Sequence, residues 1–149
     1  MKDIFQNYRK EEITFIGLGN HFRSDDGFGL EFIKKIKGKF INSFTEFDNV
    51  DEVILNLCND KSHGLVIFVD SSDFNEEPGT VNVFSYHEIE DIGKHFHKIP
   101  LKLYMKLLSK SNNKSFLIAV QIETTAEIIE PKLSKKVAYT LEHLYRKIT

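Results

Sequence analysis

Several carboxylate and imidazole side chains stand directly after or before segments whose composition is typical of strands or helices. These candidates are Asp25, Asp26, Asp70, His95 and His97. Carboxylate oxygens and imidazole nitrogens are ligands for borderline or hard divalent ions such as Zn²⁺, Ni²⁺, Mn²⁺ and Fe²⁺. If the fold brings these side chains to one cleft, the sequence predicts a metal site there.

Each candidate also has a purely structural explanation. Asp25 and Asp26 could cap the start of a helix, and Asp70 could end a strand with a turn. The two histidines could be solvated polar residues. Asp73, close to Asp70, is explained adequately by the same turn.

Other chemistries are poorly supported by the sequence. Gly17 and Gly19 begin a dinucleotide-binding pattern, but the third glycine is replaced by Phe22, and the two aspartates that follow would repel a pyrophosphate. The chain has no Gly-Lys-Ser or Gly-Lys-Thr for a Walker loop and no Gly-x-Ser-x-Gly nucleophile elbow. Cys58 lies on an apolar helix face without a histidine nearby in sequence, which favours a buried thiol.

Strands and helices alternate along the chain and must position these side chains. Short runs rich in β-branched and apolar residues predict strands at 13–18, 40–47, 65–69, 80–85 and 115–120. Apolar residues three and four positions apart predict helices. These helices carry Phe28, Phe32, Ile33 and Ile36; Val53, Ile54, Leu57 and Cys58; Leu103, Leu107 and Leu108, within 99–109; and Val137, Leu141, Leu144, Tyr145 and Ile148.

The alternation of strand and helix predicts a doubly wound α/β domain with a mostly parallel sheet and right-handed crossovers. Too few residues separate 65–69 from 80–85 for a helical crossover, so we expect the second strand to run antiparallel. The first helix is expected to be capped by Ser24 or Asp25, and the last near Ser134. Such sheets bind ligands at the carboxyl ends of their strands, where the candidate ligands stand.

Composition limits the function classes. A chain of 149 residues with 41% hydrophobic and 28% charged residues predicts a single globular domain over residues 1–149. The net charge of −2 argues against wholesale binding to nucleic acid or an anionic membrane. One cysteine excludes an internal disulfide, and neither a signal peptide nor a membrane-spanning run is evident. We expect a cytoplasmic protein.

Several segments resemble the endopeptidases that mature the large subunit of [NiFe] hydrogenases. Residues 16–29 resemble that family's opening signature, a Gly-x-Gly-Asn strand end followed by Asp-Asp/Glu-Gly-x-Gly. Residues 66–70 resemble its third strand and aspartate, 78–81 its following turn, and 120–121 with 133–134 its closing strand and helix. Residues 97–101 resemble the His-x-x-Pro-Leu form of the branch that serves formate-hydrogenlyase-type hydrogenases.

The resemblance implies a three-layer fold, a twisted five-stranded sheet with helices on both faces. It implies that Asp26, Asp70 and His97 are the metal ligands and catalytic residues, with Asp25 supporting the loop. The implied activity is removal of a C-terminal extension from the hydrogenase large-subunit precursor. Nickel is expected to arrive with that precursor, although the site could bind other divalent ions, and the protein is expected to act as a monomer.

Two other functions remain open at this point. A non-catalytic relative could dock on the precursor without cutting it, because residues 45–50 lack the glycine-rich Asp-Gly-Gly-Thr turn common in the family. An unrelated metal-dependent hydrolase could use the same sheet edge. Retention of Asp26, Asp70 and His97 favours the protease, since a docking protein has no need for three convergent ligands.

Overall fold

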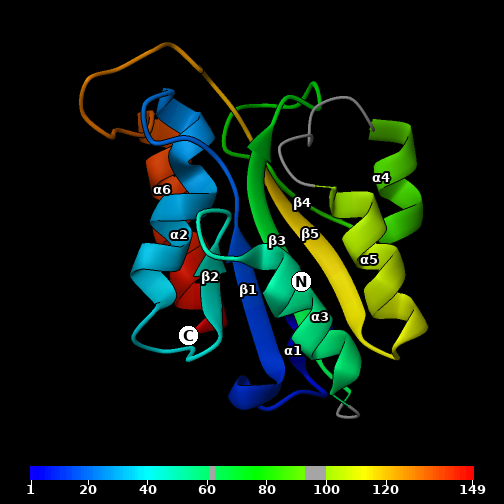
Figure 1. The fold of residues 1–149 in the computed structure, drawn as a ribbon. Coiled ribbons are helices and arrows are strands. Elements are labelled where there is room, and N and C mark those ends of the chain that lie inside the picture. The colour runs from blue at the N-terminus through cyan, green and yellow to red at the C-terminus, as the bar shows by residue number, and fades with distance from the viewer. Residues whose placement is uncertain (61–62, 93–99) are drawn as a thin grey trace.

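The fold is a five-stranded sheet between two layers of helices (Figure 1). The computed structural model describes residues 1–60, 63–92 and 100–149. The strand order is β2-β1-β3-β5-β4; β4 pairs antiparallel with β5, and the other pairs are parallel. The strands are β1 (Ile13–Gly17), β2 (Ser43–Thr45), β3 (Leu65–Ser72), β4 (Val81–Phe84) and β5 (Lys114–Gln121). The predicted α/β class and the antiparallel fourth strand are therefore confirmed.

Helices cover both faces of the sheet. One face is covered by α2 (Phe28–Ile36) and α6 (Lys135–Ile148), and the other by α3 (Val50–Asn59), α4 (Tyr86–Ile92) and α5 (Leu101–Lys110), as Figure 1 shows. A short α1 (Lys2–Phe5) and two 3-10 turns, η1 (Lys10–Glu12) and η2 (Ser24–Gly27), complete the described elements. No described helix is both long and apolar enough to cross a membrane.

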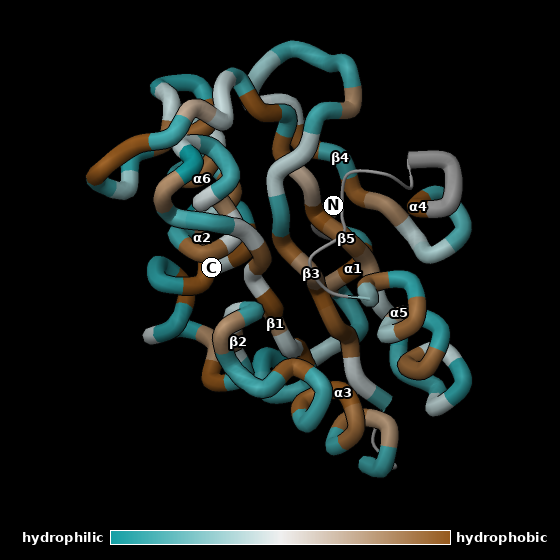
Figure 2. Tube along the Cα trace, turned by 45° about the horizontal axis from the view of Figure 1, so that its top comes forward, coloured by the Kyte–Doolittle hydropathy of each residue, from teal (hydrophilic) through white to brown (hydrophobic). Residues whose placement is uncertain are grey.

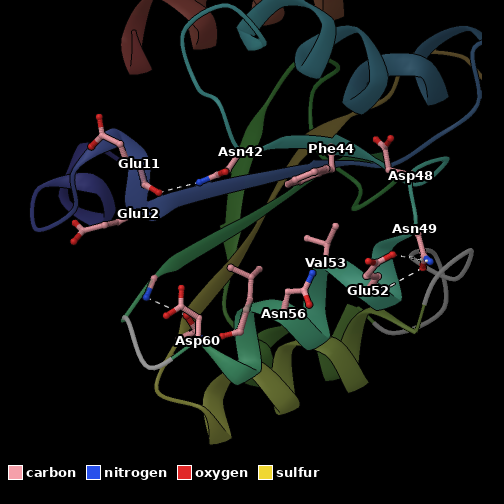
Figure 3. A pocket seen from close by; sticks show the side chains of 13 residues that line it. Glu11, Glu12, Asn42, Phe44, Asp48, Asn49, Glu52, Val53, Asn56 and Asp60 are labelled. Carbon is pink, nitrogen blue, oxygen red and sulfur yellow. Dashed lines mark hydrogen bonds between the residues drawn. The ribbon is translucent and has the colours of Figure 1, made fainter.

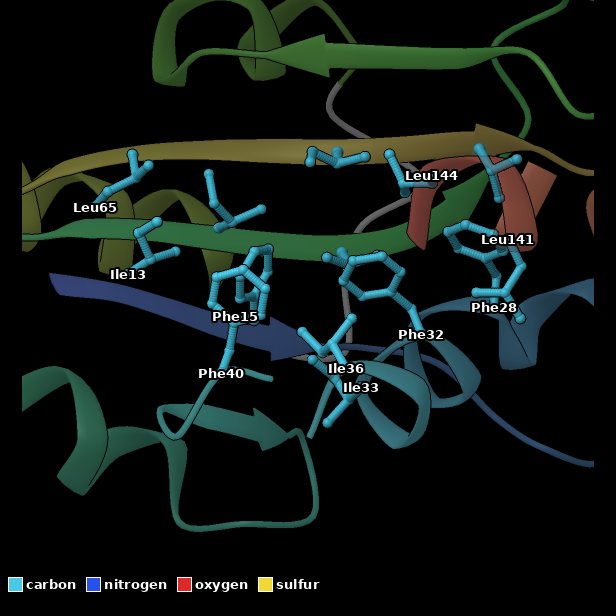
Figure 4. Close-up of a cluster of buried hydrophobic side chains, with 14 of the residues drawn as sticks. Ile13, Phe15, Phe28, Phe32, Ile33, Ile36, Phe40, Leu65, Leu141 and Leu144 are labelled. Atoms are coloured by element: carbon cyan, nitrogen blue, oxygen red, sulfur yellow. The ribbon is translucent and has the colours of Figure 1, made fainter. Parts of the chain in front are cut away.

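The central strands contribute to two separate apolar clusters because successive strand residues point to opposite faces. Leu65, Ile67 and Val69 pack with α2 and α6, whereas Val66 and Phe68 pack with the helices of the other face. Figure 4 shows the first cluster, and Figure 2 shows apolar segments concentrated along the strands. All five residues of β1 are buried, as predicted for a strand covered on both faces.

The third strand is longer than its apolar run. The sequence predicts a strand that ends at Asp70, but β3 continues to Ser72 because Asp70, Ser71 and Ser72 pair with residues of β5. Asp70 is therefore a strand residue and not the start of a turn. The turn begins at Asp73, whose Oδ1 accepts the Asn75 N–H at 3.1 Å.

The predicted cap of α2 is wrong, whereas the predicted cap position of α6 is right. A 3-10 turn, η2, precedes α2, whose N-cap is Gly27, so neither Ser24 nor Asp25 caps the helix with its side chain. Ser134 is the N-cap of α6, as predicted, but its side chain makes no capping bond. Asp25 and Ser134 instead bind each other across two loops, as described below, and the Ser24 hydroxyl donates to the Lys132 carbonyl at 3.2 Å.

Helix α4 is missing from the sequence-based assignment. It follows β4 after one residue, Ser85, whose backbone N–H donates to the Glu88 carboxylate at 2.8 Å. A Ser followed three residues later by Glu is a known sign of a helix start. The signal for α4 was therefore present in the sequence, although its apolar periodicity is short.

Candidate functional site

Asp25 anchors the turn after β1 to the loop between β5 and α6. Its side chain is fully buried. One carboxylate oxygen accepts the N–H groups of Glu123 at 2.9 Å and Thr124 at 3.1 Å, together with the Ser134 hydroxyl at 2.9 Å. The other oxygen accepts the Ser134 N–H at 2.7 Å. This bonding gives Asp25 the loop-supporting role that the resemblance implies.

Asp26 lies in a tightly closed turn. The Asn20 N–H donates to the Asp26 carbonyl at 2.9 Å, and the Asp26 N–H donates to the Arg23 carbonyl at 3.1 Å. Gly19 has φ +134°, and a Cβ at that position would lie 1.8 Å from the Asp26 carbonyl oxygen. Only glycine can close the turn in this way. The half-buried Asp26 side chain is thus held next to the end of β1 by fixed backbone.

Asp70 lies at the same edge of the sheet. The last residue of β1, Gly17, pairs with Val69, so Asp70 is the first β3 residue beyond that pairing. The turn η2, which carries Asp26, contacts β3. Asp70 is 7% exposed, and its Oδ1 accepts the Ser71 N–H at 2.8 Å. Two predicted ligands therefore come from separate elements to the carboxyl ends of adjacent strands.

The histidine part of the predicted site cannot be placed with them. His95 and His97 lie outside the described residues. Among the residues that the structure does describe, no three His, Cys, Asp or Glu side chains are grouped closely enough to hold a metal ion. It therefore stays a prediction that Asp26, Asp70 and His97 form one ligand set.

Two serines beside Asp70 were not foreseen. The hydroxyls of Ser71 and Ser72 are buried, and neither finds a hydrogen-bond partner within the described parts of the chain. Buried hydroxyls normally have a partner. These groups add polar atoms next to a candidate ligand, and sequence reasoning had treated them only as part of a turn.

Glu46 is a second unforeseen residue at this edge. Its carboxylate accepts the Gly19 N–H at 2.7 Å, and its own N–H donates to the Gly17 carbonyl at 2.9 Å. Glu46 therefore fastens the loop after β2 to the turn after β1. It stands in the segment where the chain departs from the family's glycine-rich turn, and that departure was the signal that could have drawn attention to it.

Gln121 and Tyr104 have structural roles. The buried Gln121 side chain accepts the N–H groups of Phe74 and Glu76 and donates to Asp73 at 3.0 Å, so it orders the loop after β3. Tyr104 donates its hydroxyl to Asp51 and links α5 to α3. Burial, together with this hydrogen bond, raises the pKa of Tyr104 to about 12, so the phenol stays protonated at neutral pH.

A cavity of about 560 Å³ lies between α3 and β2, away from the predicted ligands (Figure 3). It is lined by acidic residues such as Glu12, Asp48 and Glu52 around apolar Phe44 and Val53. Those carboxylates already bind neighbours: Glu12 accepts from Arg9, Asp48 from the Thr45 N–H and Glu52 from Asn49. None of Asp25, Asp26 and Asp70 lines this cavity, so we do not assign the candidate site to it.

Comparison with known proteins identifies the family. The family model of the hydrogenase maturation proteases matches residues 51–149. A Methanocaldococcus jannaschii protein assigned to the same class is 30% identical over 146 residues, covering 90% of this chain and 92% of its own. Among solved structures, the maturation protease HycI of Thermococcus kodakarensis has a TM-score of 0.77 at 22% identity, over 99% of this chain and 94% of its own. The endopeptidase HycI of Escherichia coli has a TM-score of 0.71 at 16% identity, over 91% and 87%.

These two structures share the fold, including the predicted twisted five-stranded sheet with helices on both faces. The family model covers the C-terminal two-thirds of the chain, and the archaeal relative covers nearly all of it. The chain therefore belongs to the hydrogenase maturation protease family.

Proposed function

We propose that this protein is an endopeptidase that removes the C-terminal extension of a [NiFe] hydrogenase large-subunit precursor after nickel has been inserted. We further propose that it recognises the precursor's nickel through Asp26, Asp70 and His97. The His-x-x-Pro-Leu segment at 97–101 extends the proposal to precursors of the formate-hydrogenlyase type.

The observation that carries the proposal is the placement of Asp26 and Asp70. They come from separate elements to one sheet edge. The backbone around Asp26 is fixed by the Asn20 N–H, which donates to the Asp26 carbonyl, and by the anchored Asp25. A binding constellation needs such rigid support to hold its geometry. In a chain of this family, a rigid pair of carboxylates at the ligand-binding edge supports recognition of a metal-loaded substrate.

The proposed chemistry uses the metal as part of the substrate. Asp26 and Asp70 supply oxygen ligands, and His97 supplies a nitrogen ligand, which leaves other positions on the ion for the precursor's own groups. Anchoring the ion holds one peptide bond in place, and the ion can polarise its carbonyl. Water is the proposed nucleophile, because the sequence has no serine elbow and Cys58 packs on α3 against the α5 side of the core.

The proposal is tested by intact mass measurement of the precursor after incubation with the protein. We expect loss of a C-terminal fragment from the nickel-loaded precursor and no change in the nickel-free form. Asp26→Ala and His97→Ala are expected to reduce processing at least about a hundredfold, because each would remove a proposed ligand of the precursor's nickel. The circular dichroism spectrum of Asp26→Ala should be unchanged, because the half-buried Asp26 side chain is not part of the core. Asp3→Asn, an exposed carboxylate of α1, is the matched control and should process normally.

Three outcomes would contradict the proposal in different ways. Normal processing by both alanine variants would overturn the ligand assignment. Cleavage of the nickel-free precursor would indicate a hydrolase that carries its own ion. Complex formation without cleavage of either form would indicate a docking relative.

A further inference from the structure

Three exposed apolar side chains stand on loops next to the candidate site. Phe22 is 59% exposed, Phe47 75% and Ile129 93%. Phe22 belongs to the turn after β1, Phe47 to the loop after β2 and Ile129 to the loop between β5 and α6. We call these three residues the apolar rim. Contiguous exposed apolar groups with polar surroundings are typical of protein interaction sites.

The rim residues are brought together by specific contacts. Phe22 and Phe47 line the same hollow of about 350 Å³, together with Gly19, Asn20, His21 and Glu46. The Ile128 N–H donates to the Phe22 carbonyl at 2.9 Å, which places Ile129 beside the turn that carries Phe22. Figure 1 shows the turn after β1 and the long loop before α6 at the same end of the molecule.

The loops that carry the rim are held in place. The Glu46 carboxylate binds the Gly19 N–H at 2.7 Å, and Asp25 binds the backbone of Glu123, Thr124 and Ser134. Loops whose backbone is already fixed lose little backbone freedom when a partner binds, which favours affinity. The rim is therefore a preformed surface.

The hollow borders the turn that carries Asp26. Asn20, which lines the hollow, donates its N–H to the carbonyl of Asp26. A polypeptide whose metal is bound at Asp26 must pass over the neighbouring surface, and the hollow with Phe22 and Phe47 is part of that surface, because Gly19 and Asn20 line it and contact the Asp26 backbone. The exposed charges of the same loops are mainly acidic: Asp48, Glu123, Glu127 and Glu130 against Arg23 and Lys132.

We propose that the apolar rim binds a segment of the large-subunit precursor in which an apolar side chain enters the hollow between Phe22 and Phe47 and basic residues lie alongside. The inference rests on the proposed function and adds to it the surface that grips the substrate. Aromatic residues at the centre of an interface contribute a large part of the binding energy, so these two phenylalanines are the expected anchors.

The test compares Phe22→Ala and Phe47→Ala with Tyr139→Ala, using the nickel-loaded precursor. Tyr139 lies on α6 and is 75% exposed, the same fraction as Phe47, so it controls for loss of an exposed aromatic ring. We expect each phenylalanine variant to raise the precursor KM and Kd about tenfold and to leave kcat within about twofold. The reason is that the rim would bind the precursor equally well in the ground state and in the transition state, so its loss weakens binding without slowing the chemical step. Tyr139→Ala should match the wild type, and added salt should weaken wild-type binding.

The outcomes separate this inference from the proposed function. If the wild type cleaves the precursor and both phenylalanine variants keep its KM and Kd, the proposed binding role of the apolar rim is wrong, whereas the proposed protease activity is supported. If the variants lose kcat at unchanged KM, the two residues do not bind substrate as proposed. If the wild type neither binds nor cleaves any nickel-loaded precursor of its organism, the proposed function and the rim fail together.

Discussion

Asp25 is fully buried, which is rare for an acidic side chain. Its charge is compensated by four hydrogen bonds, three from backbone N–H groups and one from the Ser134 hydroxyl. Bonds of this kind to a charged acceptor are stronger than those between neutral groups. Asp25 therefore fixes the shape of the turn, and the half-buried Asp26 follows it directly in the chain.

Replacing Asp25 with Asn tests this division of roles. The amide keeps one oxygen but turns an NH2 group toward backbone N–H donors, so at least one buried donor loses its partner. We expect the free energy of unfolding to fall by about 3 kcal/mol, measured by urea denaturation. Asp3→Asn should change it by less than about 0.5 kcal/mol. Equal stability of the two variants would show that Asp25 is not an anchor.

At the scale of elements, α2 lies unusually close to the strand ends that carry the site. A Cβ on Gly29 would lie 2.3 Å from the Leu18 carbonyl oxygen and 2.3 Å from that of Val69. Both obstacles are backbone atoms and cannot rotate away. Because Gly29 has no side chain, α2 can lie this close to the ends of the strands, directly before Asp70.

The Gly29→Ala substitution should accordingly push α2 away from the sheet. We expect a loss of about 3 kcal/mol in the free energy of unfolding, at the upper end for overpacking. Gly38→Ala is the matched control, because a Cβ there meets nothing within 4 Å, and it should be neutral or slightly stabilising. A Gly29 variant as stable as the Gly38 variant would contradict the close packing.

The elements also show what the sequence can predict. Strands β1, β3 and β5 were recognisable because burial on both faces demands continuous apolar runs. The extension of β3 through Asp70 was not, since it depends on pairing with β5 and not on apolar character. Asp25 was expected to cap its own helix, but its partners lie 98 to 109 positions later, a distance that local spacing cannot reveal.

At the scale of the whole molecule, the two apolar clusters share one sheet. Leu117 and Ala119 face one cluster, while the intervening Ile118 faces the other. Loss of order on one side must therefore disturb the strands that support the other side. This arrangement favours cooperative unfolding of the chain as the single domain expected from its length.

Phe32→Ala tests that cooperativity. Phe32 is fully buried in the cluster under α2 and α6, and its truncation should cost about 3–5 kcal/mol. Amide hydrogen exchange should show the same loss of protection in α5, on the opposite face, as in α6. Unchanged protection in α5 would mean that the two faces unfold separately. Phe68→Ala, in the second cluster, is the reciprocal variant.

The reach of Asp25 across the chain also has a consequence for protein synthesis. The ribosome makes the turn after β1 before it makes Ser134, whose N–H and hydroxyl hold that turn from 109 positions further along. Until that stretch has left the exit tunnel, the Asp25 carboxylate is hydrated and the turn has no fixed shape. The nascent chain thus completes its candidate ligand edge only after residues 123–134 have emerged and have docked against the turn.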